Sequence, residues 1–175
     1  MFRTVALPEG VFGQLCLHSM PGYFEAFDVV QHAIAGQQIT SVVCLASLQE
    51  IRRKSPAYAQ AIEARRLSWT QIIFPVADWG VPGNWCAFWE LARRVARRLL
   101  AGERILIHGD AGVGRTGTLA ICVLMALGMT RREACAAVWA AGSRPETSAQ
   151  ETLVRWVAET HLTHRSIEPR DIETL

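Results

Sequence analysis

The stretch from Arg104 to Met129 reads RILIHGDAGVGRTGTLAICVLMALGM. Its first five residues are mostly apolar and fit a short strand, residues 109–115 form a glycine-rich loop, and the residues from Thr116 onward fit a buried helix. A strand that passes through small residues into a helix brings backbone N–H groups and a helix N-terminus to one point. Such a point binds anions, most often phosphate. We therefore predict a phosphate-binding loop around which the fold is organised.

The segments on both sides of this loop alternate between strand and helix patterns. Apolar and β-branched residues predict strand pieces within 2–18 and strands over 39–45 and 70–76. Helical spacing predicts helices over 23–35, 55–66, 84–101, 130–141 and 147–165, and a short helix after residue 47. This alternation indicates a single α/β domain over 1–175, with a mostly parallel sheet covered by helices on both faces and a polar tail over 166–175.

Three of the expected helices begin with the capping-box pattern. In this pattern a Ser or Thr caps the first turn, and an acidic or amide side chain three residues later bonds back to the cap. The pairs are Ser47 with Glu50, Thr130 with Glu133, and Thr147 with Gln150.

The order of the central elements places two loops at one edge of the sheet. Strand 70–76, helix 84–101 and strand 104–108 form a βαβ unit, in which the two strands run parallel. The loop that contains Asp78 and the loop 109–115 then leave the same end of the sheet. Because ligands of open α/β folds bind at that end, we expect both loops to face one pocket.

The composition is that of an ordinary globular protein. The 175 residues are 50% hydrophobic and 19% charged, and the net charge of +2 is too small to indicate binding to nucleic acid or to a membrane surface. No segment has the pattern of a signal peptide, and the longest apolar run, Thr118 to Met129, is shorter than the ~20 residues of a membrane span. Five cysteines in apolar contexts predict a reduced, cytoplasmic protein, and no metal-ligand spacing or cofactor motif stands out.

The loop partly fits two nucleotide-binding motifs. Gly112, Gly114 and Gly117 fit the G-x-G-x-x-G of dinucleotide-binding folds, but the region that would supply the acidic ribose contact, 130–141, has the pattern of a capped helix. Gly109 to Thr116 fits a Walker loop with Arg115 in place of lysine, and no later strand ends in an aspartate for magnesium. A P-loop nucleotide-binding protein is kept as a remote alternative.

A third motif accounts for more of the chain. His108 to Gly117 resembles the His-Cys-x5-Arg-Ser/Thr signature of the cysteine-dependent protein phosphatases, in particular the compact dual-specificity and bacterial tyrosine phosphatases. The segment Asp78-Trp-Gly-Val-Pro82 is similar to the mobile loop that carries the general acid in this family. Ser143-Arg-Pro followed by Gln150 is similar to its glutamine loop. The resemblance covers nearly the whole chain and implies hydrolysis of phosphomonoesters through a phosphocysteine.

Position 109 departs from the family signature, because Gly109 stands where the family has its nucleophilic cysteine. None of the five cysteines lies in the loop, so the phosphocysteine cannot form. Losing a covalent nucleophile costs on the order of 10⁶ in kcat. We therefore predict a domain that binds phosphate without cleaving it. Two hypotheses stay open: an engineered or otherwise inactivated enzyme, which the retained Asp78 and Arg115 favour, and a natural pseudophosphatase that binds phosphorylated partners.

The resemblance also implies a role for each residue of the site. The phosphate cradle consists of Asp110, Ala111, Gly112, Val113, Gly114 and Arg115, and the guanidinium of Arg115 binds two phosphate oxygens. The other implied roles are Asp78 as general acid, His108 as a brace for the loop, Thr116 beside the nucleophile position and Gln150 as the residue that orients water. Without the resemblance, Asp78 fits a turn, Gln150 a capping box and Thr116 the start of a helix.

The ligand expected from this loop carries one phosphate. The loop has no cation besides Arg115, whereas phosphatases of polyphosphorylated inositides place further cations there, and Asp110 would repel a second phosphate. We therefore expect a phosphorylated protein or peptide, with phosphotyrosine first. The arginines at 93, 94, 97 and 98 predict a solvated helix face, with docking of a partner as the alternative.

Overall fold

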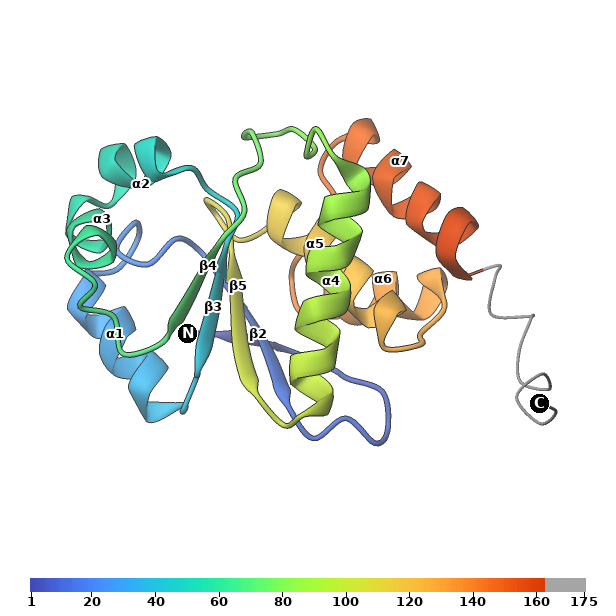
Figure 1. Cartoon of the computed structure of the whole chain (residues 1–175), viewed down its shortest axis with the longest axis horizontal. Coiled ribbons are helices and arrows are strands. Elements are labelled where there is room, and N and C mark those ends of the chain that lie inside the picture. The colour runs from blue at the N-terminus through green and yellow to red at the C-terminus, as the bar shows by residue number, and fades with distance from the viewer. Residues whose placement is uncertain (163–175) are drawn as a thin grey trace, which may run out of the picture.

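A five-stranded sheet forms the centre of the computed structural model, which describes residues 1–162 (Figure 1). The predicted tail over 166–175 lies outside the described residues. The strand order is β1-β2-β5-β3-β4. β1 pairs with β2 in antiparallel fashion, and all other neighbouring strands are parallel, so the predicted mostly parallel sheet is confirmed. The strands are β1 (Arg3–Val5), β2 (Gln14–His18), β3 (Ser41–Cys44), β4 (Thr70–Ile73) and β5 (Arg104–His108).

Helices cover both faces of the sheet (Figure 1). One side carries α1 (Phe27–Gly36), α2 (Leu48–Lys54) and α3 (Pro56–Glu63). The other side carries α4 (Trp85–Leu100), α5 (Gly114–Ala126), α6 (Arg131–Ala140) and α7 (Ser148–Val157), which continues as a π-helical turn, Ala158–Leu162. Within residues 1–162, no helix combines the length and apolar character needed to cross a membrane.

The central strand β5 and the helix α5 explain why the decisive stretch is so apolar. Ile105 and Ile107 pack in the core beneath α4 to α7, whereas Leu106 packs in the core beneath α1 and α3. A strand with a core on each face needs apolar residues at every position. α5 is surrounded by α4, α6 and α7, and its residues from Gly114 to Met125 are all buried.

The start of α1 differs from the prediction. The helix begins at Phe27 rather than at Tyr23, and Phe24, which helical spacing places on the buried face, lies outside the helix and is 67% exposed. Residues 21–25 form a turn and a bend instead of helix, with Gly22 at a φ of +82°. The N–H of Met20 donates to the carbonyl of Asp110, so the segment lies beside the glycine-rich loop.

Two glycine-to-alanine variants test how closely α5 packs against the segment that contains Arg144. A Cβ on Gly117 would lie 2.5 Å from the nitrogen of Arg144 and 2.8 Å from its Cα. Gly117→Ala should therefore lower the free energy of unfolding by about 1–3 kcal/mol. Gly36→Ala is the control, because a Cβ there would meet nothing within 4 Å. Urea denaturation measures both variants, and equal stability of the two would contradict the packing described for α5.

Candidate functional site

The two loops predicted to share one edge of the sheet do meet there. They line a pocket of about 170 Å³, which Asp78 and Trp79 border on one side and residues 110–116 on the other, with Glu146 and Gln150 from the region around the start of α7. The glycine-rich loop needs a glycine at 112, because its φ is +77° and a Cβ would lie 2.3 Å from the carbonyl oxygen of His18. The chain order and the loop composition therefore suffice to form this pocket.

His108 holds the backbone at the base of the loop. Its side chain is fully buried, Nδ1 donates to the carbonyl oxygen of Gly109 at 3.1 Å, and the Tyr58 hydroxyl lies 3.0 Å from Nε2. Burial lowers the pKa of His108 to about 4, so the imidazole is neutral at pH 7. A neutral ring with both nitrogens near polar partners is suited to bracing the loop rather than to transferring protons at neutral pH.

The guanidinium of Arg115 is buried and almost fully engaged. Nη1 donates to Glu50 Oε2 at 3.0 Å and to the carbonyl of Val76 at 2.8 Å. Nη2 donates to Glu50 Oε1 at 2.8 Å and lies 3.1 Å from Asp78 Oδ1. The hydrogen bonds use three of the four hydrogens of the terminal nitrogens, and Asp78 forms an ion pair with Nη2. Nε–H takes part in none of these contacts, and Nε lies 3.4 Å from the position that a Cβ on Gly109 would occupy.

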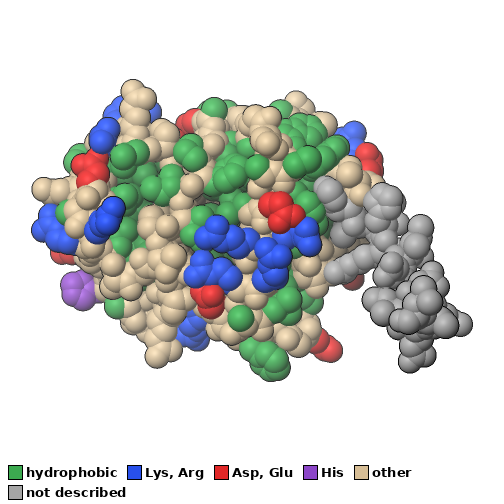
Figure 2. Space-filling view, viewed as in Figure 1, with side chains coloured by type: hydrophobic (Ala, Val, Ile, Leu, Met, Phe, Trp, Pro, Cys, Tyr) green, Lys and Arg blue, Asp and Glu red, His purple; other side chains and the backbone are tan. Residues whose placement is uncertain are grey.

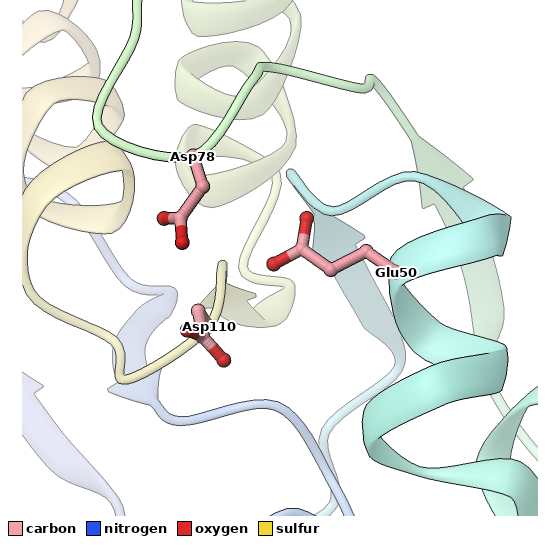
Figure 3. Close-up of side chains that lie close together, drawn as sticks. All are labelled: Glu50, Asp78 and Asp110. Carbon is pink, nitrogen blue, oxygen red and sulfur yellow. The ribbon is translucent and has the colours of Figure 1, made fainter.

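Three carboxylates converge beside Arg115. Figure 3 shows Glu50, Asp78 and Asp110 directed toward one another, and their nearest ligand atoms all lie within 4.8 Å. Lys54 lies among them: Nζ bonds to Asp110, is 3.5 Å from Glu50 and is 4.0 Å from Asp78. The carboxylates are therefore each paired with Lys54 or Arg115, and the five groups sum to a charge of −1.

Gly109 occupies a position where a side chain fits. Its φ is not in the left-handed region, and the nearest neighbours of an added Cβ would be side-chain atoms: Thr116 Oγ1 at 3.3 Å and two atoms of Arg115 at 3.4 and 3.5 Å. Thr116 is fully buried, and its Oγ1 has no hydrogen-bond partner within residues 1–162. The backbone therefore does not require glycine at 109, and the Thr116 hydroxyl lies beside that position.

Gln150 connects the loop of Asp78 to α7. Its side chain is buried, with Oε1 accepting from the N–H of Glu146 at 2.8 Å and Nε2 donating to the carbonyl of Gly80 at 3.1 Å. In the loop that it holds, Trp79 has a φ of +58°, a conformation that is costly for a residue with a side chain. The amide of Gln150 thus fixes a strained segment next to Asp78.

The sequence missed two residues of this site, Glu50 and Lys54. Glu50 was interpreted as a capping-box residue only, whereas Gln150 was interpreted both as a capping-box residue and, from the family resemblance, as a site residue. Ser47 and Thr147 do cap their helices, but the side chains of Glu50 and Gln150 turn into the site instead. Only Thr130 and Glu133 form both halves of a box. Glu50 was therefore not recognised as the partner of Arg115, and nothing in the sequence singles out Lys54.

The basic face predicted on α4 is present and partly paired. Figure 2 shows Lys and Arg side chains gathered on the face of the molecule where α4 lies. Arg93 pairs with Glu90, and Arg98 pairs with Glu103 and is only partly exposed, whereas Arg94 and Arg97 are exposed. This face does not border the pocket described above.

Removing the Glu50 carboxylate tests how strongly the site depends on it. The pair with Arg115 is buried, with side chains 11% and 3% exposed, so Glu50→Gln should cost about 3 kcal/mol of unfolding free energy. Glu63→Gln is the control, because its pair with Arg52 is 44% and 60% exposed and should be worth under about 1 kcal/mol. Urea denaturation compares them, and similar losses would contradict the assignment.

The same variant has an expected pH dependence. Burial, the largest single influence, raises the pKa of Glu50, but the hydrogen bonds and charges of Arg115 and Lys54 outweigh it, so the pKa lies below its usual value. A lowered carboxyl pKa stabilises the fold above the unfolded-state pKa of about 4.3, and this contribution is lost as pH falls through the lower folded-state value. The stability difference between the unaltered chain and Glu50→Gln should therefore shrink below about pH 4.3.

Asp78 competes with a bound anion for Arg115. A bidentate phosphate that leaves Glu50 in place needs Nε and one Nη2 hydrogen, and Asp78 contacts Nη2. Asp78→Asn should therefore tighten phosphate binding about two- to fivefold, the value of a half-exposed ion pair. Calorimetric titration with phosphate measures the affinity of each variant. Asp28→Asn is the control, because Asp28 is an exposed residue of α1. Weaker binding by Asp78→Asn would show that Asp78 helps to hold the anion instead.

Comparisons with known proteins agree with this architecture. The family model described as Swiss Army Knife protein, DSP-PTPase phosphatase domain, matches residues 21–174. The fold is similar to that of kinase associated phosphatase with its catalytic cysteine substituted by serine, with a TM-score of 0.76 and 16% identity over 96% of this chain and 97% of that chain. It is also similar to Tk-PTP in its active form, with a TM-score of 0.69 and 22% identity over 90% and 97% of the two chains.

A human tyrosine phosphatase-like serine/threonine/tyrosine-interacting protein has the same fold, with a TM-score of 0.66 and 20% identity over 91% of this chain and 97% of that chain. No curated protein sequence matches the chain. At these identities the solved structures establish the fold alone, whereas the family model covers most of the residues. The chain belongs to the family of DSP-PTPase phosphatase domains of Swiss Army Knife proteins.

Proposed function

We propose that this dual-specificity phosphatase-like domain binds phosphorylated protein side chains, phosphotyrosine first, and that Gly109 prevents it from hydrolysing them. The observation that carries the proposal is the environment of position 109. Arg115 Nε and Thr116 Oγ1 would both lie within 3.4 Å of a Cβ there, so two groups that can donate hydrogen bonds lie beside a position with no side chain. The surrounding pocket retains the parts of a phosphate site while the reacting atom is missing.

The binding step follows from the residues that line the pocket. The loop 110–115 and the N-terminus of α5, which begins at Gly114, supply N–H groups and a partial positive charge for a phosphate. Arg115 contributes its Nε and Nη2 hydrogens once Asp78 has moved aside. A thiolate at position 109 would repel a bound phosphate dianion. Gly109 carries no charge, which favours phosphate binding by the unaltered chain.

None of the five cysteines, the exposed Cys86 included, lines the described pocket, so none is placed to replace the missing nucleophile. Burial raises the pKa of Cys44 to about 12 and also raises the pKa values of Cys16, Cys122 and Cys135, so these thiols stay protonated at pH 7. The Asp110 carboxylate is paired with Lys54. Asp78 has the position of a general acid, but protonating a leaving group has no effect until a nucleophile attacks phosphorus.

Two origins of such a domain stay open. The retained Asp78, and the buried Gln150 that holds its loop, favour an engineered or otherwise inactivated enzyme, because a binding module has no need of a general acid. A natural pseudophosphatase that binds phosphorylated partners is the second candidate, and the ion pair of Asp78 with Arg115 is compatible with it too. A cytoplasmic location stays a prediction from the cysteine pattern.

Restoring the nucleophile tests the proposed function. Gly109→Cys should gain hydrolysis of p-nitrophenyl phosphate by several orders of magnitude, since a covalent nucleophile is worth on the order of 10⁶. Adding Asp78→Ala to this variant should remove about 10²–10⁴ of the gained rate. Circular dichroism confirms that each variant is folded. A folded Gly109→Cys variant without activity would contradict the proposal, as would phosphate binding that survives Arg115→Ala.

A further inference from the structure

Arg3, in the edge strand β1, reaches the back of the phosphate loop. Its Nη2 donates to the carbonyl of Gly112, and its Nη1 donates to the carbonyl of Gly142 at 2.6 Å. Arg3 pairs with Leu17 in the β1–β2 register, which places it at the same edge of the sheet as the loop. The residue lies before the part of the chain that the family model matches, residues 21–174, and no motif in the sequence marks it.

Ser143 holds the loop from the same side. Its side chain is buried, and Oγ lies 2.7 Å from the carbonyl oxygen of Gly112 and 3.1 Å from that of Val113. The carbonyl of Gly112 is therefore held by donors from two other elements, Arg3 from β1 and Ser143 from the segment between α6 and α7. The carbonyl of Val113 accepts from the N–H of Gly117 at 2.7 Å and has Ser143 as a second, longer contact. Neither Arg3 nor Ser143 lines the pocket.

The orientation of these carbonyls sets the orientation of the next N–H groups. In a trans peptide the C=O and the N–H of one unit point in opposite directions, and the described chain contains no cis peptide bond. Carbonyls of Gly112 and Val113 that point toward Arg3 and Ser143 leave the N–H groups of Val113 and Gly114 on the opposite side. That side is the pocket, which Val113 and Gly114 line.

Such anchoring matters because the loop is rich in glycine. Gly112 has φ +77°, and glycine has low barriers to other backbone conformations, some of which would turn a carbonyl toward the anion. A cradle fixed before binding avoids the loss of chain entropy that a mobile loop suffers when it closes on its ligand. Gly142, whose carbonyl accepts the second bond of Arg3, has a φ of +70°, a conformation that glycine adopts without the strain that a Cβ brings.

We propose that Arg3 and Ser143 are positioning residues of the phosphate site, which hold the carbonyls of Gly112 and Val113 outward so that the N–H groups of Val113 and Gly114 face the anion. This inference rests on the phosphate binding proposed above. The forked guanidinium is required because one side chain bonds two carbonyls on separate segments. A lysine keeps the charge of Arg3 but cannot make both bonds in that geometry.

The test uses ¹⁵N NMR on the full chain. Arg3→Lys and Ser143→Ala should lower the heteronuclear NOE of the amides of Gly112, Val113 and Gly114 without phosphate, because the loop gains fast motion. Titration with inorganic phosphate should show binding weakened about fivefold by either variant, the value of one net hydrogen bond. Arg52→Lys is the control for the arginine, since Arg52 is 60% exposed and pairs only with Glu63 on the helices of the other sheet face.

The outcomes separate this inference from the proposed function. Loop amides that stay as rigid in Arg3→Lys and Ser143→Ala as in the unaltered chain would overturn the positioning role, whatever the phosphate affinity. Loop amides that become more mobile in these variants support the positioning role. If the unaltered chain shows no phosphate-dependent shifts, that absence contradicts the proposed function and leaves the positioning role standing. Arg3→Ala adds a check on charge: if Arg3→Lys binds like the unaltered chain and only Arg3→Ala is weakened, Arg3 acts through long-range attraction and the positioning role fails.

Discussion

The buried guanidinium of Arg115 determines how this site is assembled. A cation with a side chain only 3% exposed is stable only if carboxylates and carbonyls replace its lost hydration. Glu50 from α2 supplies a bidentate carboxylate, and the segment that follows β4 supplies the carbonyl of Val76. One side chain at the start of α5 thereby connects α2 and the segment after β4 to the phosphate loop.

The positive charge of Arg115 explains why the pocket should bind phosphate. It also explains why the Asp78 carboxylate contacts Arg115. Glu50 binds the two terminal nitrogens, which leaves Nε and one Nη2 hydrogen free of Glu50, and Nε lies beside position 109. Asp78, which is half exposed and lies on a strained loop, contacts that Nη2. A ligand phosphate therefore competes with Asp78 and leaves Glu50 undisturbed. Lys54 balances much of the remaining negative charge, so an incoming dianion meets less repulsion than three carboxylates alone would produce.

Much of this arrangement is predictable from the sequence, and the rest depends on side-chain choices that the sequence leaves open. The βαβ order brings Asp78 and the glycine-rich loop together, because parallel strands end at one edge of the sheet. The sequence around Glu50 has the capping-box pattern whether the Glu50 side chain bonds Ser47 or Arg115. The buried guanidinium of Arg115 decides between these two contacts. The contacts of Lys54 with Asp110 and of Arg3 with Gly112 join residues 56 and 109 positions apart, so no local pattern reports them. The predicted start of α1 was wrong for a similar reason, because Met20, in the segment before α1, donates to the carbonyl of Asp110 in the phosphate loop.

The central claim is that the domain recognises a phosphate it does not cleave. Calorimetric titration of the unaltered chain with a phosphotyrosine peptide, followed by an assay for free phosphate after several hours, tests both halves of that claim together. The account predicts one saturable site, no binding of the unphosphorylated peptide, and no phosphate released above the rate in buffer. Absence of saturable binding, or release of phosphate in an amount comparable to the protein present, would contradict it.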